Sequence, residues 1–260
     1  MSEHLDLKNY FKGSDDVVRE FYIDYLSHFK PIKKGLRILE IGCGGGWNLL
    51  PFAELECEVV GIDDVYKSIE QARDFFDSHD KLGIFVCDDF ITMPEGVLGK
   101  FDVVIVHDEI EHIPQSEKEI FVANIKKYMV EDGVVFFTFP AWQMPFGGYQ
   151  QICDGFASKL PFIHILPNIL YKTILKWCGE SDEKIKALLD IKRCKMEIEK
   201  FESLIDNSDF YIEDKIHWFV DPYNCRKREA KPRRVNSLLS KIPYLRNYYT
   251  ASSFYLLKIK

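Results

Sequence analysis

The sequence predicts an α/β protein built on a doubly wound, mostly parallel sheet, and three observations carry this prediction. Short apolar runs alternate with helical segments between residues 36 and 140, as expected when helices connect buried parallel strands. A glycine-rich turn follows the first run directly. Two later runs near the carboxyl end alternate in polarity, which predicts an antiparallel hairpin that completes a seven-stranded sheet.

The first helix and the parallel strands follow from local patterns. Residues 16–30 place apolar side chains four positions apart and predict a helix. Pro31 and Gly35 then interrupt the chain before the first strand. The predicted parallel strands are 36–41, 59–63, 84–88, 101–106 and 134–139. The predicted helices among them are 66–78 and 117–130.

The alternation of strand and helix stops after Pro140. Residues 141–192 are aromatic and helical, and we expect an inserted lid over the ends of the strands. One helix is predicted over 183–206, with an apolar face formed by Cys194, Ile198, Phe201 and Ile205. The hairpin strands are predicted at 210–220 and 253–259, separated by a loop at 221–250.

The chain therefore divides into three predicted regions. They are an N-terminal helical cap at 1–35, a nucleotide-binding core at 36–140 and 193–260, and a substrate lid at 141–192. The sequence leaves open whether the N-terminal helix, with Tyr10, Phe11 and Tyr22, closes over a bound ligand.

Composition limits the classes of function. The chain has 260 residues, 47% of them apolar and 29% charged, and a net charge of −7. This is ordinary for a globular protein and unfavourable for a general nucleic-acid binder. Seven cysteines without a CxxC pair predict reduced thiols rather than zinc or disulfides. No run reaches the ~18 apolar residues that span a bilayer. The polar amino terminus has no signal core, so we expect a cytoplasmic location.

The strongest chemical signal is the glycine-rich turn EIGCGGGWN. Glycines let the backbone turn sharply and let a ligand approach without meeting a Cβ. Acids surround this turn: Glu40 lies within it, Asp63 and Asp64 end the second strand, and Asp88 and Asp89 end the third. Such acids can bind ribose hydroxyls, an adenine amino group and a ligand ammonium group. The pattern therefore favours a cationic nucleoside over a pyrophosphate.

These motifs resemble those of the class I S-adenosylmethionine-dependent methyltransferases, over residues 36–140 and the two carboxy-terminal strands. The resemblance implies a Rossmann-like methyltransferase fold and S-adenosyl-L-methionine as the cofactor. It also implies the cofactor-binding residues, which are Glu40, Gly42, Cys43, Gly44, Gly46, Asp63, Asp64, Asp88, Asp89, Phe90 and His107. A nicotinamide cofactor is disfavoured because the turn lacks the GxGxxG spacing.

The fourth strand ends in HDEIEHIP, a dense group of ionisable side chains. Glu111 and His112 resemble the Glu-His pair of a methyltransferase subgroup that includes ubiquinone-type O-methyltransferases. His112 is thus the expected base or acceptor-orienting group, with Glu111 beside it. We expect no metal, although Asp108, Glu111 and His112 also resemble a divalent-ion set of some O-methyltransferases. The plainer alternative is that the pair only fixes the loop beside the cofactor.

Two other segments bear on the acceptor. The predicted substrate-binding residues are Trp142, Phe146, Tyr149 and Gln150, which combine stacking surface with amide donors and acceptors; a turn that merely anchors the lid is the alternative. The loop at 222–246 carries eight Lys or Arg residues and one acid. It would suit an anionic acceptor or a membrane surface, whereas a solvated loop is the simpler interpretation.

The sequence as a whole predicts transfer of a methyl group to a small-molecule or carrier-linked acceptor, with a hydroxyl oxygen as the expected accepting atom. Two alternatives stay open. One is methylation of RNA, which the acidic net charge disfavours. The other is a non-catalytic module that binds the cofactor and regulates a partner.

Overall fold

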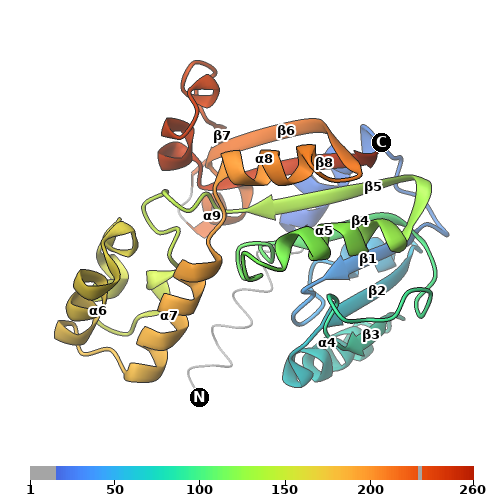
Figure 1. Ribbon diagram of the computed structural model, residues 1–260. Coiled ribbons are helices and arrows are strands. Elements are labelled where there is room, and N and C mark those ends of the chain that lie inside the picture. The colour runs from blue at the N-terminus through green and yellow to red at the C-terminus, as the bar shows by residue number, and fades with distance from the viewer. Residues whose placement is uncertain (1–15, 228–229) are drawn as a thin grey trace.

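The computed structural model describes residues 16–227 and 230–260, which form one twisted eight-stranded sheet covered by helices (Figure 1). The strands are β1 (Arg37–Ile41), β2 (Glu58–Asp63), β3 (Ile84–Cys87), β4 (Phe101–His107), β5 (Met129–Phe139), β6 (Phe210–Val220), β7 (Arg233–Arg234) and β8 (Ser252–Ile259). Their order is β3-β2-β1-β4-β5-β8-β6-β7. β1 to β5 pair in parallel, and β8 pairs antiparallel with β5 and β6. The predicted fold class is confirmed.

The sheet has one strand more than the seven predicted. β7 is only two residues long, and it pairs with the end of β6 at Trp218 and Val220. Two exposed arginines carry no alternation of polar and apolar side chains, so no periodic pattern marks this strand.

Apolar clusters cover both faces of the sheet because side chains alternate along each strand. On one face, α5 (Lys118–Lys127) and α8 (Ile198–Asp206) pack over Leu39 and Ile41, in front of the sheet in Figure 1. On the other face, a π-helical turn (Val18–Tyr22) continues into α2 (Ile23–Ser27). This segment, α3 (Leu50–Glu54) and α4 (Tyr66–Ser78) pack there with Ile38.

The lid projects from one end of the sheet (Figure 1). It contains α6 (Asn168–Trp177), α7 (Asp182–Cys194) and three short 3₁₀ turns (Gln150–Ile152, Phe156–Lys159 and Ile163–Ile165). Tyr171, Leu175, Ile185 and Leu188 are among the buried residues of its own small core. α7 ends two residues past the predicted lid boundary, and the boundaries of the three regions stay a prediction. Tyr10 and Phe11 lie outside the described residues.

The single helix predicted over 183–206 is wrong. The chain leaves the helical conformation at Lys195, which has φ −6° and ψ 141°, and re-enters a helix at Ile198. Gln115 Nε2 donates to the carbonyl oxygens of Cys194 and Lys195, 2.5 and 2.6 Å away. The Ile198 amide donates to Asn247 Oδ1 at 2.9 Å. These tertiary contacts satisfy both helix ends, so α7 packs in the lid while α8 packs on the sheet.

Candidate functional site

The candidate site lies at the carboxyl ends of the parallel strands, where the strand order reverses next to β1. β1 pairs with both β2 and β4, and ligands of open α/β sheets bind outside such a reversal. Two cavities lie at this edge, and each is lined in part by the segment 107–112, which begins with the last residue of β4. We name them the acidic cavity and the aromatic cavity after the residues given below.

The acidic cavity has a volume of about 440 Å³. It is lined by these residues singled out in the sequence: Gly42, Asp63, Asp64, Asp88, Asp89, Phe90 and His112. The structure thus brings the glycine turn and the acidic ends of β2 and β3 around one space. Burial of the ring of Phe90 gives this space an apolar wall beside the carboxylates.

Asp63 fixes the glycine turn as well as facing the acidic cavity. Its Oδ2 accepts from the Gly44 amide at 2.8 Å, and its Oδ1 accepts from the Val65 amide at 2.9 Å. Gly44 has φ +51°, and a Cβ there would meet no protein atom within 4 Å. The turn is therefore open toward a ligand at Gly44 and held from behind by Asp63.

Cys43 and Gly46 support the turn from the core side. A Cβ on Gly61 would lie 2.6 Å from the Cys43 sulfur, and a Cβ on Gly46 would lie 2.9 Å from the Phe85 ring. The Cys43 side chain is buried and points toward β2, so only its backbone can contribute to a ligand site.

Glu40 is fully buried beneath the turn. Its Oε1 accepts from Asn48 Nδ2 at 2.7 Å, and its Oε2 has no partner among the described residues. Burial raises the pKa of Glu40 to about 8, with the negative charge of Asp63 adding to the effect. A buried carboxyl oxygen that lacks a donor suits a cationic ligand group nearby. The residues present therefore fit the ammonium group of the implied cofactor.

Glu109 is an acid of the cavity that the sequence reasoning missed. It lines the acidic cavity, and a Cβ on Gly42 would lie 2.5 Å from its Oε2. Burial raises the pKa of Glu109 to about 7, and the charges of Asp63 and Asp64 act in the same direction. Only the contact with Gly42 distinguishes it from its neighbours, and no sequence spacing reveals that contact.

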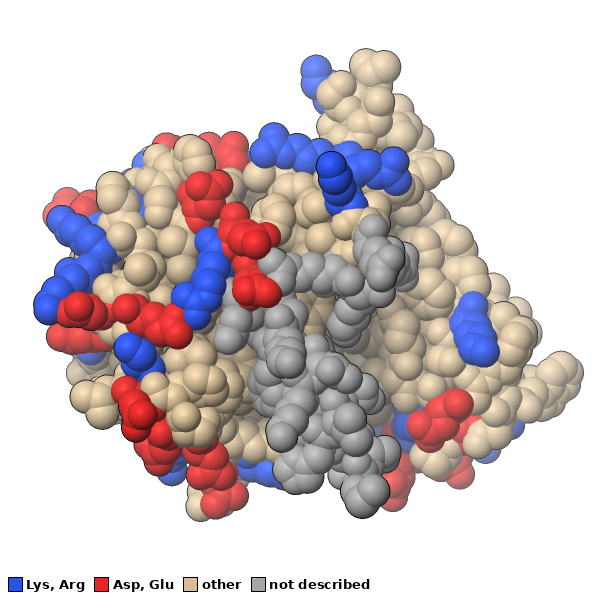
Figure 2. All heavy atoms as spheres, turned by 180° about the vertical axis from the view of Figure 1, so that it is seen from behind, with Lys and Arg blue, Asp and Glu red and all other residues tan. Residues whose placement is uncertain are grey.

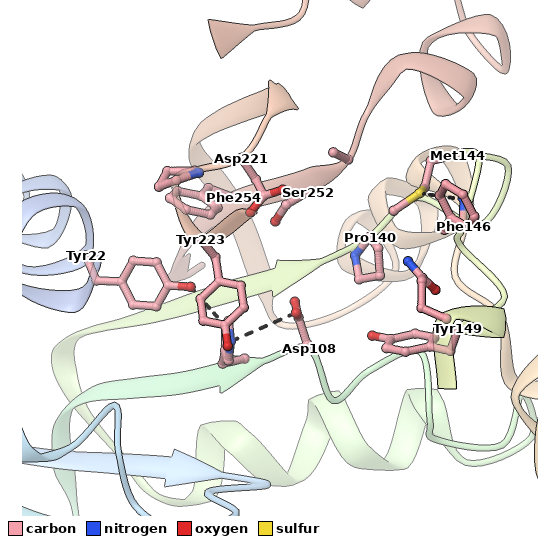
Figure 3. A pocket seen from close by; sticks show the side chains of 14 residues that line it. Tyr22, Asp108, Pro140, Met144, Phe146, Tyr149, Asp221, Tyr223, Ser252 and Phe254 are labelled. Atoms are coloured by element: carbon pink, nitrogen blue, oxygen red, sulfur yellow. Dashed lines mark hydrogen bonds and ion pairs between the residues drawn. The ribbon is translucent and has the colours of Figure 1, made fainter. Parts of the chain in front are cut away.

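The aromatic cavity, of about 110 Å³, lies between the ends of β4, β5, β6 and β8. Its lining comes from five separate segments of the chain, and the labelled side chains in Figure 3 surround the cavity. Its ring-bearing and thioether side chains are Tyr22, His107, Met144, Phe146, Tyr149, Tyr223 and Phe254. Phe146 and Tyr149, predicted to bind substrate, are among them. His107, predicted to bind cofactor, lines this cavity rather than the acidic one.

His107 is held by two hydroxyl groups. Its Nδ1 lies 3.0 Å from the Tyr22 hydroxyl and 2.6 Å from Thr138 Oγ1. Thr138 Oγ1 in turn donates to Asp108 Oδ1 at 2.9 Å. Asp108 has φ +48°, a left-handed conformation that aspartate tolerates better than most residues. That conformation turns its carboxylate back toward β5 and into the aromatic cavity.

Glu111 and His112 lie apart from this network. Glu111 is buried, and its Oε1 accepts from the Tyr149 hydroxyl at 2.6 Å. Burial raises its pKa well above the usual value. The exposed His112 ring lies 5.1 Å from the Tyr149 ring, centroid to centroid. Among the described residues no three His, Cys, Asp or Glu side chains gather as a metal site, so Asp108, Glu111 and His112 form none.

Two of the predicted substrate residues pack inside the lid instead. Trp142 is buried with its ring 4.7 Å from that of His164, and its carbonyl oxygen lies 2.8 Å from His164 Nε2. Gln150 is fully buried, and its Nε2 donates to the carbonyl oxygens of Pro145 and Leu160. Neither lines the aromatic cavity. They join segments of the lid to one another, because a buried amide must satisfy its donors locally.

The basic loop is only partly available to an anion. Arg246 is buried in ion pairs with Glu199 and Glu202, at 2.8 and 2.6 Å. The described basic residues of the loop that remain exposed are Lys231, Arg233, Arg234 and Lys241. Figure 2 shows basic side chains gathered at the top of the rear face, the end of the molecule that carries β7. The side chains from 226 to 229, at and after the end of α9 (Pro222–Lys227), lie outside the described set.

A parallel sheet with a hairpin after β5, a glycine turn after β1 and acids after β2 and β3 together define the class I methyltransferase fold. Residues 38–133 match a family described as a methyltransferase domain. Over these residues the chain is therefore similar to methyltransferase domains, which supports the predicted class of S-adenosylmethionine-dependent methyltransferases.

Two relatives show how far the similarity in sequence reaches. The ubiquinone biosynthesis O-methyltransferase of Pelagibacter ubique is 33% identical over 124 residues, 47% of this chain and 48% of that protein. The protein of the same name from Bartonella quintana is 25% identical over 214 residues, 79% of this chain and 72% of that protein. The match to the Pelagibacter relative thus spans about half its length.

Solved structures share the fold. The magnesium protoporphyrin IX methyltransferase of Synechocystis PCC 6803 with bound S-adenosylhomocysteine has a TM-score of 0.57 at 15% identity, covering 96% of this chain and 84% of that one. The plantazolicin methyltransferase has the same TM-score and identity, with coverage of 100% and 88%. Within residues 16–227 and 230–260, no helix has the length and apolar character needed to cross a membrane.

Proposed function

We propose that this protein transfers a methyl group from S-adenosylmethionine to a hydroxyl oxygen of a small acceptor. The observation that carries this proposal is that neighbouring residues of the segment 107–112 line both cavities, His107 and Asp108 the aromatic one and Glu109 and His112 the acidic one. A cofactor in the first cavity and an acceptor in the second would approach each other at the end of β4. Two relatives are O-methyltransferases by name, which supports oxygen as the accepting atom.

The acidic cavity would hold the cofactor. Asp63 keeps lone pairs for ribose hydroxyls beyond the two amides that it already accepts, because a carboxylate offers about four acceptor positions. Asp88, Asp89 and Phe90 would frame the base, and Glu40 would face the ammonium group. When bound, S-adenosylmethionine supplies a methyl group on a positively charged sulfur. The surrounding carboxylates favour that charge over a neutral ligand.

The aromatic cavity would hold the acceptor. Its rings offer flat apolar surface, and the hydroxyl groups of Tyr22 and Tyr223 project toward the end of β4, where Asp108 lies (Figure 3). Stacking of a planar group between such rings fixes its orientation, and in-line transfer of a methyl group depends mainly on that orientation. A hydroxylated ring is the acceptor that this lining suits.

The exposed part of the basic loop supports a carrier-linked or anionic acceptor. Arg233 pairs with Val220, next to Asp221, which lines the aromatic cavity. An anionic portion of the acceptor would therefore lie beside Arg233 and Arg234 while the reacting group enters the cavity. Arginine is well suited to such groups because its guanidinium binds phosphate or carboxylate in a bidentate manner.

Calorimetric titration of S-adenosylhomocysteine tests the cofactor site. Asp63→Ala should weaken binding at least tenfold, about 1.4 kcal/mol, because it removes the ribose acceptor and loosens the turn. Asp77→Ala, an exposed acid on α4, is the matched control and should bind as the wild type does. Equal affinity for the wild type and Asp63→Ala would contradict the proposed site.

A methyl-transfer assay with labelled cofactor tests the reaction. Catechol should be methylated and an RNA transcript should not. Transfer to RNA alone would establish the alternative activity. Cofactor binding without transfer to any acceptor would favour the non-catalytic module.

A further inference from the structure

We infer that His107 is the general base that removes the proton from the acceptor hydroxyl, with Thr138 and Tyr22 as positioning residues. This inference rests on the proposed function and deepens it. It moves the base from the acidic cavity, where His112 lies, to the aromatic cavity.

Thr138 determines which nitrogen of His107 carries hydrogen. A threonine hydroxyl has one hydrogen to donate, and here it goes to Asp108 Oδ1. An ionised carboxylate can only accept. In its 2.6 Å contact with His107 Nδ1, Thr138 Oγ1 must therefore accept. Nδ1 of the neutral ring is then protonated and faces the oxygen atoms of both Thr138 and Tyr22, and Nε2 keeps its lone pair.

The Nε2 atom is well placed to take a proton. It lies 3.9 Å from Asp108 Oδ2, beyond hydrogen-bond distance but within reach of an ion pair. A proton gained by Nε2 would make the ring a cation beside that carboxylate, which stabilises the charge.

The other candidates in the two cavities fit the role less well. Glu111 is buried and bound to Tyr149. Burial raises the pKa of Tyr22 far above its usual value, so its hydroxyl stays protonated. Asp108 already accepts from Thr138. His112 is exposed and lines the acidic cavity, on the side proposed for the cofactor.

The step balances with the groups named. The acceptor O–H bond breaks and its proton moves to His107 Nε2, while an oxygen electron pair forms the new bond to the methyl carbon. The carbon–sulfur bond breaks and its electron pair stays on sulfur, which becomes a neutral thioether. The products are a methyl ether, S-adenosylhomocysteine and an imidazolium ion that later loses its proton to water.

The closing experiment compares histidine variants in a methyl-transfer assay with catechol. His107→Asn keeps a donor toward Thr138 but has no basic nitrogen. It should lower kcat about 10²–10⁴-fold and leave the calorimetric affinity for S-adenosylhomocysteine within about threefold. With a more acidic acceptor, 4-nitrocatechol, the same substitution should lower kcat less, because the acceptor proton leaves more easily. His79→Asn, an exposed histidine on the surface, is the control and should match the wild type.

The pH profile distinguishes a base from a structural histidine. The wild-type kcat should rise with pH as the catalytic base loses its proton, and His107→Asn should lose that rise. The ionisable groups that line the cavity with His107 are Tyr22, Asp108, Asp221, Tyr149 and Tyr223. Thr138→Val should flatten the rise and lower kcat without raising KM, and Thr138→Ser should restore both.

Three outcomes would overturn the inference. His107→Asn could keep the wild-type kcat and pH profile. Alternatively, His112→Asn could lose the rise of kcat with pH while His107→Asn keeps it. Each result would reject His107 as the base and leave the proposed function standing. A wild-type protein that binds S-adenosylhomocysteine but methylates no hydroxyl would instead reject the proposed function, and the inference with it.

Discussion

Buried carboxyl groups dominate the candidate site at the scale of single residues. Glu40 and Glu109 lie in or beneath a cavity lined by further acids, and burial raises the pKa of each. Without a ligand these groups repel one another and destabilise their ionised forms. A cationic ligand would relieve that repulsion, so the site is prepared for positive charge at some cost to the stability of the free protein.

Glu40→Gln measures that cost. The pKa of Glu40 is about 8 in the folded protein and near 4.5 when unfolded, so the folded state binds more protons between these values. Stability from this group is therefore lost as pH rises from about 4.5 to 8. Glutamine does not titrate, and its oxygen can still accept from Asn48. The variant should gain roughly 1–4 kcal/mol over the wild type between pH 5 and 8.

Urea denaturation of the ligand-free protein at several pH values supplies the measurement. Asp77→Asn, an exposed acid on α4, should show no such gain. Parallel stability curves for Glu40→Gln and the wild type across this range would show that Glu40 does not titrate there.

The break between α7 and α8 is the decisive feature at the scale of elements. Asn247 is fully buried and joins the start of α8 to the last loop of the chain. Its Oδ1 accepts from the Ile198 amide at 2.9 Å, and its Nδ2 donates to Glu199 Oε2 at 2.6 Å. This one side chain caps the helix from a position 49 residues away in sequence, which lets the lid leave the sheet.

Asn247→Ala should destabilise the protein by about 1–3 kcal/mol, because it leaves the buried Ile198 amide without its acceptor and Glu199 Oε2 without its donor. Urea denaturation gives the free energy of unfolding. Asn207→Ala, an exposed asparagine after the same helix, should cost less than about 0.5 kcal/mol. Equal losses for the two variants would show that the cap contributes nothing specific.

The proposed cofactor should stabilise the whole molecule by mass action. A ligand at 100 times its dissociation constant adds about 2.7 kcal/mol to the free energy of unfolding. For a domain of this size, S-adenosylhomocysteine at that excess should raise Tm by roughly 5–10 °C. Thermal denaturation with NADH is the control and should give no shift. A shift with NADH alone would contradict the assignment of the cofactor.

Much of the fold could be predicted from the sequence because its signals are local. The helix at Tyr66–Ser78 begins and ends where its periodicity does, and the parallel strands follow short apolar runs. The acids after β2 and β3 share a cavity with Gly42 because the carboxyl ends of parallel strands meet at one edge. These features depend on neighbours in the chain and on a general rule of sheet topology.

Tertiary contacts decided the side-chain positions that the sequence left open or predicted wrongly. His107 ends β4 and His112 lies five positions further on, yet the structure places them in different cavities. Glu109 packs against Gly42, and the Gln150 amide donates to two carbonyl groups of the lid. A pattern in the sequence reports which side chains are present near a strand end. The direction in which each one points is set by packing against residues that are distant in sequence, and packing is a property of the folded chain alone.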